Sequence, residues 1–445
     1  MKSTRRQRVP ERRGALRGRH GLAGAATVVL FALVACSGGG SDAGGSPDAA
    51  TPAGSPGASD APSRQDADLV IWTTEPASRA VTPIAKKFGQ ENGISVAVQV
   101  IASDLAANAI TANAAGNGPD IVTLPNDFLG GALQNGAVAP LSLTADDLSA
   151  YDEGAVTSVT RNDQVWALPY GTENLVLYRN TDAVAKAPST VEDLVGTGQA
   201  AVGKGKVKRA LALPVGQEGD AYHLYAFFSS AGGSLFGKKP DGQYDPEQVG
   251  IGDEASVKAA QKIAALGEKG SKVLSRSIDG TNAIAQFTEG KSAYLVSGPW
   301  ALADIRKSEV SYDITPIPGF QGEAPAAPFL GVQAFWTLSN AKNPAFAEEF
   351  VTKTMNTPEA MTAMYDEDPR PPARTDVLKA VSAKDPDMAK LAAGAKNASL
   401  LPDFPFMAGV WPALSQAFAS IVGGEDPAAT MTSAGTAIRS AVTAP

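Results

Sequence analysis

The stretch LVIWTTEPASRAVTPIAKKFGQENGISVAVQV, residues 69–100, decides the fold. Its first four residues form an apolar run with β-branched members, which is typical of a buried strand. Residues 76–91 have helical character, and Gly93 can end that helix. Residues 94–100 then alternate between apolar and small or polar side chains, as strands do. The stretch therefore predicts a strand, a helix and a second strand.

The residues that follow extend this alternation. Ser103 is predicted to cap a helix that reaches Ala115. Gly118-Pro119-Asp120 then turns the chain into a strand at residues 121–124. Strands and helices at this spacing predict an α/β fold with a parallel sheet covered by helices. Ligands of such sheets bind beyond the carboxyl ends of the strands, so we expect the functional site there.

The rest of the chain shows similar signals. Strands are predicted at residues 165–168 and 175–178, on either side of a crossing at residues 169–173. Helices are predicted at residues 255–267, 343–355, 388–397 and 426–442. A folded body of about 380 residues is large for one hydrophobic core, so we expect two lobes.

The N-terminus has the pattern of an export signal. Eight Lys and Arg residues precede an apolar run at residues 21–35, which is shorter than the roughly 20 residues that span a bilayer. Leu33-Val34-Ala35-Cys36 resembles the lipobox of bacterial lipoproteins, and Cys36 is the only cysteine. We therefore predict that residues 1–35 are a signal peptide and that Cys36 is lipidated.

Residues 36–66 begin with this cysteine and are rich in Gly, Ser, Ala, Pro and Asp, a composition typical of a flexible tether. Two acyl chains would give stable membrane attachment. We expect a lipid-anchored protein at the extracytoplasmic face of the bacterial cell membrane. The pairs Arg5-Arg6 and Arg12-Arg13 leave the choice between Sec and twin-arginine export open.

Charge and residue counts exclude several classes of function. The net charge is −8, and loss of residues 1–35 leaves 30 basic and 45 acidic residues, a net charge near −15. Such a surface argues against nucleic acid and anionic lipid as partners. Without the signal, His223 is the only histidine, so no His-rich metal site is expected.

No nucleophile elbow accompanies His223. Gly290-Lys291-Ser292 has Ala285 where a phosphate-binding loop requires its first glycine. No organic cofactor is implied. The many acidic residues leave a glycoside hydrolase open, because that chemistry needs only two carboxyl groups.

Short motifs from residue 69 onward occur in the order and spacing of a known family. They are Leu-Val-Ile-Trp at 69–72, Lys86-Lys87-Phe88, Gly118-Pro119-Asp120-Ile121, Asp127, Gly130-Gly131, Gly136, Tyr244-Asp245, Gly250, Gly298-Pro299-Trp300, Pro328-Phe329-Leu330-Gly331-Val332 and Leu401-Pro402. With these motifs the chain resembles the maltose/maltodextrin-binding proteins of ABC importers, which are family 1 extracellular solute-binding lipoproteins.

The resemblance implies two α/β lobes that close around a sugar and present it to a membrane permease. The N-terminal lobe would comprise residues 67–171 and 334–383, and the C-terminal lobe residues 175–329 and 386–440. Hinge crossings would lie near residues 171–175, 329–334 and 383–386. The family implies a monomer that binds a maltose or maltooligosaccharide-type sugar without catalysis.

The resemblance also implies the ligand-binding residues. Aromatic rings stack on the apolar faces of sugars, and charged or polar groups bind the hydroxyls. Trp300 and Trp411 match stacking tryptophans of the family, and Tyr222 matches a stacking tyrosine. Asp220 stands where the family has Glu, and His223 stands where it has Phe.

Three further acids belong to this predicted set. Asp127 and Glu173 match acids that hold sugar hydroxyls, and Glu75 follows a loop one residue shorter than in the family. Gln333 is a possible contributor. The other tryptophans stand in apolar, strand-like contexts and are predicted to pack in the core or hinge; they are Trp72, Trp166 and Trp336.

Four positions depart from the family pattern. Leu124 replaces a tryptophan, Phe128 an arginine, Pro412 a tyrosine and Ser415 an arginine. Phe128 could supply stacking instead. These departures leave the sugar open, with trehalose, cyclodextrin or another disaccharide as alternatives.

Overall fold

The computed structural model describes residues 62–240 and 242–443. They belong to one compact unit, Ser59–Pro445, which is considered by itself. The predicted signal peptide, the lipidation site Cys36 and the predicted tether up to residue 61 lie outside the described residues. Arg64, near the end of that tether, is fixed to the body, because its guanidinium lies 2.7 Å from the buried carboxylate of Asp120.

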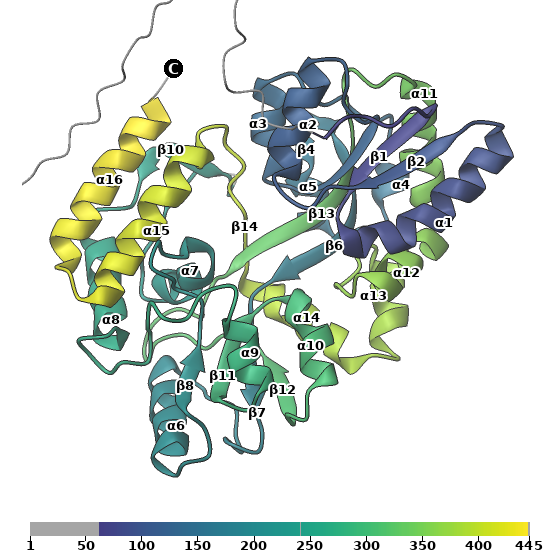
Figure 1. Ribbon diagram of the computed structural model, residues 1–445. Coiled ribbons are helices and arrows are strands. Elements are labelled where there is room, and N and C mark those ends of the chain that lie inside the picture. Colours follow the sequence, from purple (N-terminus) through teal and green to yellow (C-terminus); the bar gives the residue numbers. More distant parts are fainter. Residues whose placement is uncertain (1–61, 241, 444–445) are drawn as a thin grey trace, which may run out of the picture. The chain divides into compact units, whose positions relative to one another are not determined.

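A six-stranded sheet forms the first lobe (Figure 1). β1 (Leu69–Thr73) pairs in parallel with β2 (Val96–Val100) and β3 (Ile121–Pro125). α1 (Glu75–Asn92) and α2 (Leu105–Ala114) connect these strands. The predicted alternation of parallel strands and helices is therefore confirmed.

The ends of these two helices test the capping predictions. Gly93 adopts the left-handed conformation that ends α1, as predicted. The prediction that Ser103 caps α2 is wrong. The N-cap is Asp104, which has a left-handed backbone and makes no side-chain cap.

β13 (Phe329–Thr337) is the long strand between the two lobes in Figure 1. It pairs antiparallel with β3 and with β6 (Ala167–Asn174), and in parallel with β14 (Ser399–Leu400). Residues 169–173, predicted as a crossing, lie within β6, so the backbone there is extended. Pro169 is tolerated there because it faces an irregular step of the ladder, where an N–H is not needed.

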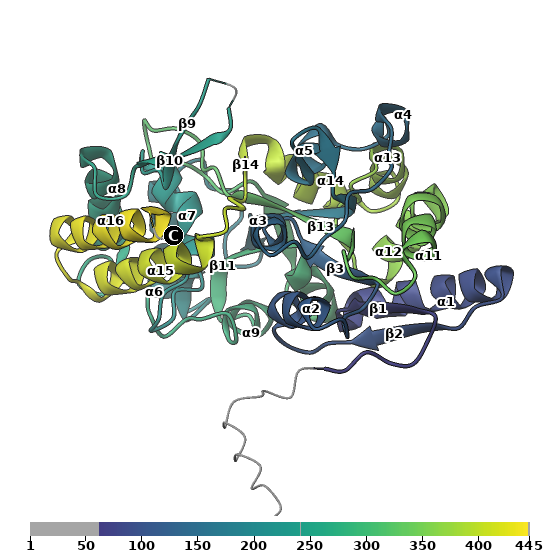
Figure 2. The ribbon, with the colours of Figure 1, turned by 90° about the horizontal axis from the view of Figure 1, so that it is seen from above.

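A second, four-stranded sheet forms the other lobe, in the order β12-β7-β11-β8. Its strands are β7 (Val176–Asn180), β8 (Arg209–Ala212), β11 (Ser292–Ser297) and β12 (Tyr312–Thr315). Its helices are α6 (Val191–Gly203), α7 (Ala221–Ser230), α8 (Glu254–Leu266), α9 (Ala283–Thr288), α10 (Leu302–Lys307), α15 (Met407–Gly423) and α16 (Pro427–Thr443). Figure 2 shows that α15 and α16 lie with α8, although they are far apart in sequence. Two sheets with helices on each confirm the two-lobed α/β fold.

The remaining elements are short or lie near the connections between the lobes. They are α3 (Phe128–Gln134), α4 (Ala145–Leu148), α5 (Glu153–Ser158), β4 (Thr160–Arg161), β5 (Gln164–Val165), β9 (Phe236–Lys238), β10 (Tyr244–Val249), the 3-10 turns η1 (Pro299–Ala301) and η3 (Ala395–Asn397), α11 (Pro344–Glu349), the π-helix η2 (Phe350–Met355), α12 (Pro358–Glu367), α13 (Thr375–Ser382) and α14 (Pro386–Gly394). The single helix predicted at residues 343–355 is therefore an α-helix that continues as a π-helix.

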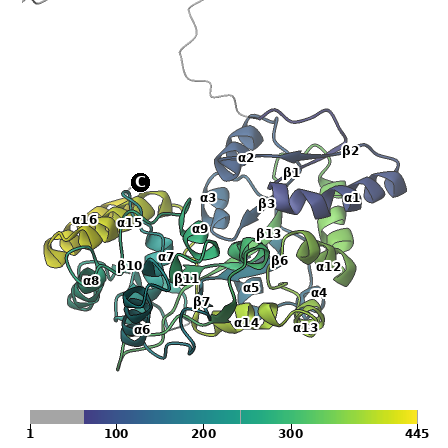
Figure 3. The same ribbon diagram turned by 60° about the horizontal axis from the view of Figure 1, so that its bottom comes forward.

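β6 is followed after one residue by β7, and α14 packs against both β6 and β12 (Figure 3). The lobe and hinge bounds that the resemblance implied stay predictions. Trp72 and Trp336 are fully buried in the first lobe, and half-buried Trp166 packs against the same cluster, so all three tryptophans have the predicted packing role.

Candidate ligand-binding site

Four aromatic side chains gather around the start of β13. Tyr222, in the first turn of α7, stacks on Phe329 with ring centroids 6.2 Å apart. Trp411, near the start of α15, meets Phe329 edge-on at 5.5 Å. Trp300, in η1, lies 6.4 Å from Tyr222. Three of the predicted residues are therefore brought together, and Phe329 is the fully buried ring that supports two of them.

Trp300 is the exposed member of this cluster, with 36% of its surface accessible. Gly298 leaves room for the Trp300 ring, because a β-carbon at that position would collide with the ring as it is placed. The carbonyl of Gly298 accepts a hydrogen bond of 2.9 Å from the buried Tyr178 hydroxyl. The backbone under Trp300 is thus fixed while its ring stays available for stacking.

The Tyr222 hydroxyl is buried and has no hydrogen-bond partner among the described residues. Burial raises its pKa, and the negative charges of Asp127 and Asp220 raise it further. A buried hydroxyl without a partner costs roughly 1–3 kcal/mol. A ligand that hydrogen-bonds to Tyr222 would remove this cost.

Asp220 and His223 form a rigid pair beside this hydroxyl. The Asp220 carboxylate caps α7 by accepting from the His223 backbone N–H at 2.9 Å, and its second oxygen lies 2.7 Å from His223 Nδ1. The His223 ring meets Trp300 edge-on at 6.2 Å. Ser415, one of the departures, accepts from the Ala221 N–H at 3.1 Å, so it helps to hold this end of α7.

Asp127 belongs to the first lobe and precedes α3. Burial raises its pKa to about 6, and the nearby negative charge of Asp403 adds to this shift. Asp403 is itself paired with Arg161. Gly130 of α3 lies so close to the Asp403 carbonyl that a β-carbon would collide with it. The first lobe and the segment before α15 therefore meet around Asp127.

Glu173, on β6, belongs to a half-buried polar cluster. One of its oxygens pairs with the Arg370 guanidinium, and the other accepts from Gln333 Nε2 at 3.3 Å. Arg370 Nε also donates to Asp368 at 2.9 Å. Burial raises the pKa of Asp368 to about 6 and lowers that of Arg370. Arg370 thus fixes the orientation of Glu173.

Two predicted residues make their contacts elsewhere. Glu75 is exposed in the first turn of α1 and pairs with Arg79 at 2.6 Å. Phe128 is buried in the first-lobe core and meets Trp336 edge-on at 5.5 Å. Leu124, the departure where the family has tryptophan, is also buried in this core. The ligand roles of Glu75 and Phe128 stay predictions.

Sequence reasoning missed Phe329, Arg161, Arg370 and Asp403 as neighbours of the site. Phe329 and the Pro402-Asp403 junction stand within or next to quoted motifs, which was a usable signal. Arg161 and Arg370 carry no motif, and only the fold brings them to Asp403 and Glu173. Two guanidiniums are therefore present near the site, although the arginines expected from the family are absent.

The described part of the chain contains no group of three or more His, Cys, Asp or Glu residues arranged to hold a metal ion. None of its helices is both long and apolar enough to cross a membrane. The site offers aromatic faces, one unpartnered hydroxyl and several carboxylates. This combination suits a neutral polyhydroxylated ligand.

Comparison with known proteins agrees with this chemistry. The chain is 27% identical to the galactooligosaccharide-binding protein of Bacillus subtilis over 82% of this chain and 87% of that protein. It is 27% identical to a maltooligosaccharide ABC transporter solute-binding lipoprotein of Streptococcus pneumoniae, over 91% and 92%. It is also 27% identical to the maltodextrin-binding protein MdxE of Bacillus subtilis, over 77% and 82%.

A family description, bacterial extracellular solute-binding protein, matches residues 83–390, which is more than half of the chain. The two-lobed α/β fold and the aromatic and acidic groups near its crossings fit that description. The chain belongs to the family of bacterial extracellular solute-binding proteins.

Proposed function

We propose that this protein captures a maltose or maltooligosaccharide-type sugar outside the cell and delivers it to an ABC importer. The observation that carries the proposal is the cluster of Tyr222, Trp300 and Trp411 on Phe329, with the unpartnered Tyr222 hydroxyl beside Asp127 and Asp220. Stacking rings and charged acceptors together recognise a sugar ring from its face and its edge.

In this proposal the two tryptophans and Tyr222 stack on sugar rings. Asp127, Glu173, Asp220 and His223 bind hydroxyls, while Arg370 and Gln333 keep Glu173 in place. The protein is a monomer, anchored through lipidated Cys36 at the outer face of the cell membrane. Two relatives are named for maltooligosaccharide or maltodextrin and one for galactooligosaccharide, which supports an oligosaccharide as the ligand class.

Catalysis is not part of this proposal. A glycoside hydrolase needs one carboxyl group that donates a proton to the leaving oxygen. Both oxygens of Glu173 instead accept from Arg370 and Gln333. Release of product from maltotriose or an aryl glucoside that disappears in Glu173→Gln would contradict the binding-protein assignment.

Calorimetric titration tests the proposal directly. Maltose, maltotriose, trehalose, β-cyclodextrin and a galactooligosaccharide are each titrated into the protein, with tryptophan fluorescence followed in parallel. Maltose or maltotriose binding that is lost in Trp300→Ala and Trp411→Ala supports both the sugar and the site. Val100→Ala, which trims another exposed apolar side chain far along the first sheet, is the control.

Each other outcome changes a defined part of the proposal. Binding of trehalose, cyclodextrin or galactooligosaccharide alone keeps the site and replaces the sugar. Sugar binding that is unchanged in both tryptophan variants would mean that the sugar binds elsewhere on the protein. Absence of binding to every sugar contradicts the carbohydrate assignment and leaves a solute-binding protein for another ligand.

A further inference from the structure

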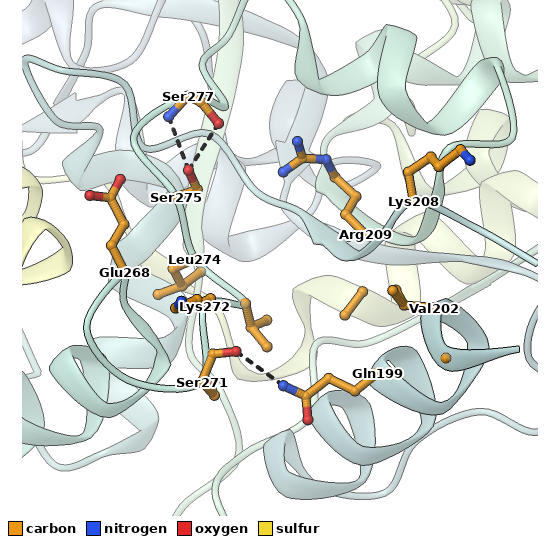
Figure 4. Close-up of a pocket in the computed structure, with 13 residues that line it drawn as sticks. Gln199, Val202, Lys208, Arg209, Glu268, Ser271, Lys272, Leu274, Ser275 and Ser277 are labelled. Carbon is orange, nitrogen blue, oxygen red and sulfur yellow. Dashed lines mark hydrogen bonds between the residues drawn. The ribbon is translucent and has the colours of Figure 1, made fainter. Parts of the chain in front are cut away.

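A pocket lies in the second lobe, and none of its lining residues belongs to the aromatic cluster (Figure 4). Its volume is about 680 Å³. It is formed by the end of α6, the start of β8 and the loop that follows α8. Its lining residues are Gln199, Val202, Gly203, Lys208, Arg209, Ala210, Glu268, Ser271, Lys272, Val273, Leu274, Ser275 and Ser277.

Three basic residues line this pocket, although the protein as a whole has a net charge of −8. Lys208, Arg209 and Lys272 form no ion pair with any carboxylate in the part of the chain that the structure describes. Glu268 is the only acid among the described residues that line the pocket, and Arg276 binds its carboxylate at 2.9 Å. The acid is therefore already neutralised, and the pocket keeps an unbalanced positive charge.

Arg209 is the central group. It is half-buried, and its Nε donates only to the Gln286 side-chain oxygen at 3.3 Å. Burial lowers its pKa. Figure 4 shows its guanidinium pointing toward Ser275 and Ser277, whereas Lys208 extends outward. A cation that has lost water without gaining an anion binds an incoming anion strongly.

Three serines also line this pocket. Ser271 Oγ is buried and has no hydrogen-bond partner among the described residues. Ser275 Oγ and Ser277 Oγ lie 2.9 Å apart. Lys272 has a left-handed backbone with φ of 60°, which is uncommon for a residue other than glycine, and such conformations gather at functional sites.

Helix capping does not account for these basic residues. The last carbonyls of α6 already accept main-chain N–H groups, since Lys204 N donates to Ala200 O and Gly205 N to Val202 O. Lys272 N likewise donates to Gly267 O, just after α8. Among the described residues the Arg209 side chain is held by the Gln286 hydrogen bond, and Lys208 and Lys272 form no ion pair, so all three cations can bind a further partner.

We propose that this pocket binds a small phosphate-bearing anion. A phosphate group presents several oxygens at once, which matches a planar guanidinium, flexible ammonium groups and serine hydroxyls. Val202, Val273 and Leu274 give the pocket an apolar wall for the organic part of a phosphate ester. The anion is either a free phosphate or phosphate ester, or the headgroup of a phospholipid. The site is separate from the proposed sugar site.

Calorimetry on the full chain in non-ionic detergent tests whether the pocket binds a soluble phosphate or phosphate ester. Inorganic phosphate and ethyl phosphate are titrated at constant ionic strength, with sodium chloride as the control for screening. Saturable binding is expected, and Arg209→Gln should weaken it about tenfold or more through loss of a charge-assisted contact. Arg439→Gln removes the same charge from an exposed position on α16 and should leave the affinity unchanged.

The rate of lysine acetylation in the presence of vesicles tests whether the pocket binds a phospholipid headgroup. Lys272 should be protected about threefold or more by phosphatidylglycerol vesicles relative to phosphatidylcholine vesicles, while the exposed Lys86 and Lys87 of α1 serve as references. Protection by vesicles without binding of the soluble anions assigns the headgroup. The proposal would be overturned if the protein showed neither anion binding nor protection of Lys272. It would also be overturned if Arg209→Gln and Arg439→Gln lost anion affinity equally. Sugar affinity should be unchanged in Arg209→Gln whatever the source.

Discussion

The aromatic and the charged parts of the candidate sugar site are held in place by different physical means. Tyr222 and Trp411 rest on Phe329, which is fully buried. Their positions follow from close packing. Glu173 instead depends on its ion pair with Arg370 and on the Gln333 hydrogen bond. Packing tolerates changes of pH and salt, whereas a buried ion pair depends on both partners remaining in place.

One strand carries both parts. Phe329 and Gln333 are four residues apart on β13, so they face the same side of the sheet. β13 also links the two lobes. Substitutions along it and around it therefore separate what packing contributes from what charge contributes.

Phe329→Ala should have the largest effect. It removes a buried ring that also lies 4.1 Å from the Tyr225 ring, so the free energy of unfolding should fall by about 3–5 kcal/mol. Urea unfolding measures this loss, and sugar titration should show weaker binding as well. Trp300→Ala, at an exposed ring, is the matched control and should cost little stability. Equal losses in both variants would contradict the supporting role of Phe329.

Arg370→Gln should come next. It leaves the half-buried carboxylates of Glu173 and Asp368 without their cation, and a desolvated polar group that loses its partner costs about 1–3 kcal/mol. A double-mutant cycle with Glu173→Gln measures the coupling in both stability and sugar affinity. Arg370→Lys should restore part of the affinity. If the two substitutions are additive, Arg370 does not position Glu173.

Sugar affinity should fall as the pH falls through about 6. The pKa of Asp127 is raised to about 6 by burial and by Asp403, and a protonated carboxyl loses its role as a charged acceptor. The loss should be about tenfold between pH 7.5 and 5, and Asp127→Asn should flatten the profile. A wild-type profile without this fall would contradict the role of Asp127.

The contribution of Asp127 to stability has the opposite sign. The carboxyl binds a proton more readily in the folded state than in the unfolded state, where its pKa is ordinary. The free energy of unfolding should therefore rise as the pH falls from 7 toward 4. Urea unfolding of the wild type and of Asp127→Asn, each at pH 7 and pH 4, checks the direction of this change. The neighbouring Arg161 and Asp403 are kept in both proteins.

Tyr222→Phe should have the smallest effect. It keeps the ring on Phe329 and removes a buried hydroxyl that lacks a partner, so unliganded stability should stay the same or rise by about 1 kcal/mol. Sugar affinity should fall by about tenfold, because the ligand loses its partner. A variant that loses stability but keeps its affinity would show that the hydroxyl serves the fold.

Much of the fold could be predicted from local patterns. Residues 69–100 gave β1, α1 and β2 because periodicity and a terminal glycine act over a few residues. Pattern reasoning failed at Ser103, because the N-cap of α2 is the neighbouring Asp104, which has a left-handed backbone.

The sequence by itself determined the α/β class, and its resemblance to a family supplied Tyr222, Trp300, Trp411, Asp127 and Glu173 as candidates for the site. The tertiary structure alone decided which groups hold them. Arg370 reaches Glu173 across 197 positions of sequence, and Arg161 reaches Asp403 across 242. No local pattern encodes such pairs, because they form only when distant strands and loops pack together. The same holds for the burial that raises the pKa of Asp127, and for the burial of the Tyr222 hydroxyl, which has no hydrogen-bond partner among the described residues.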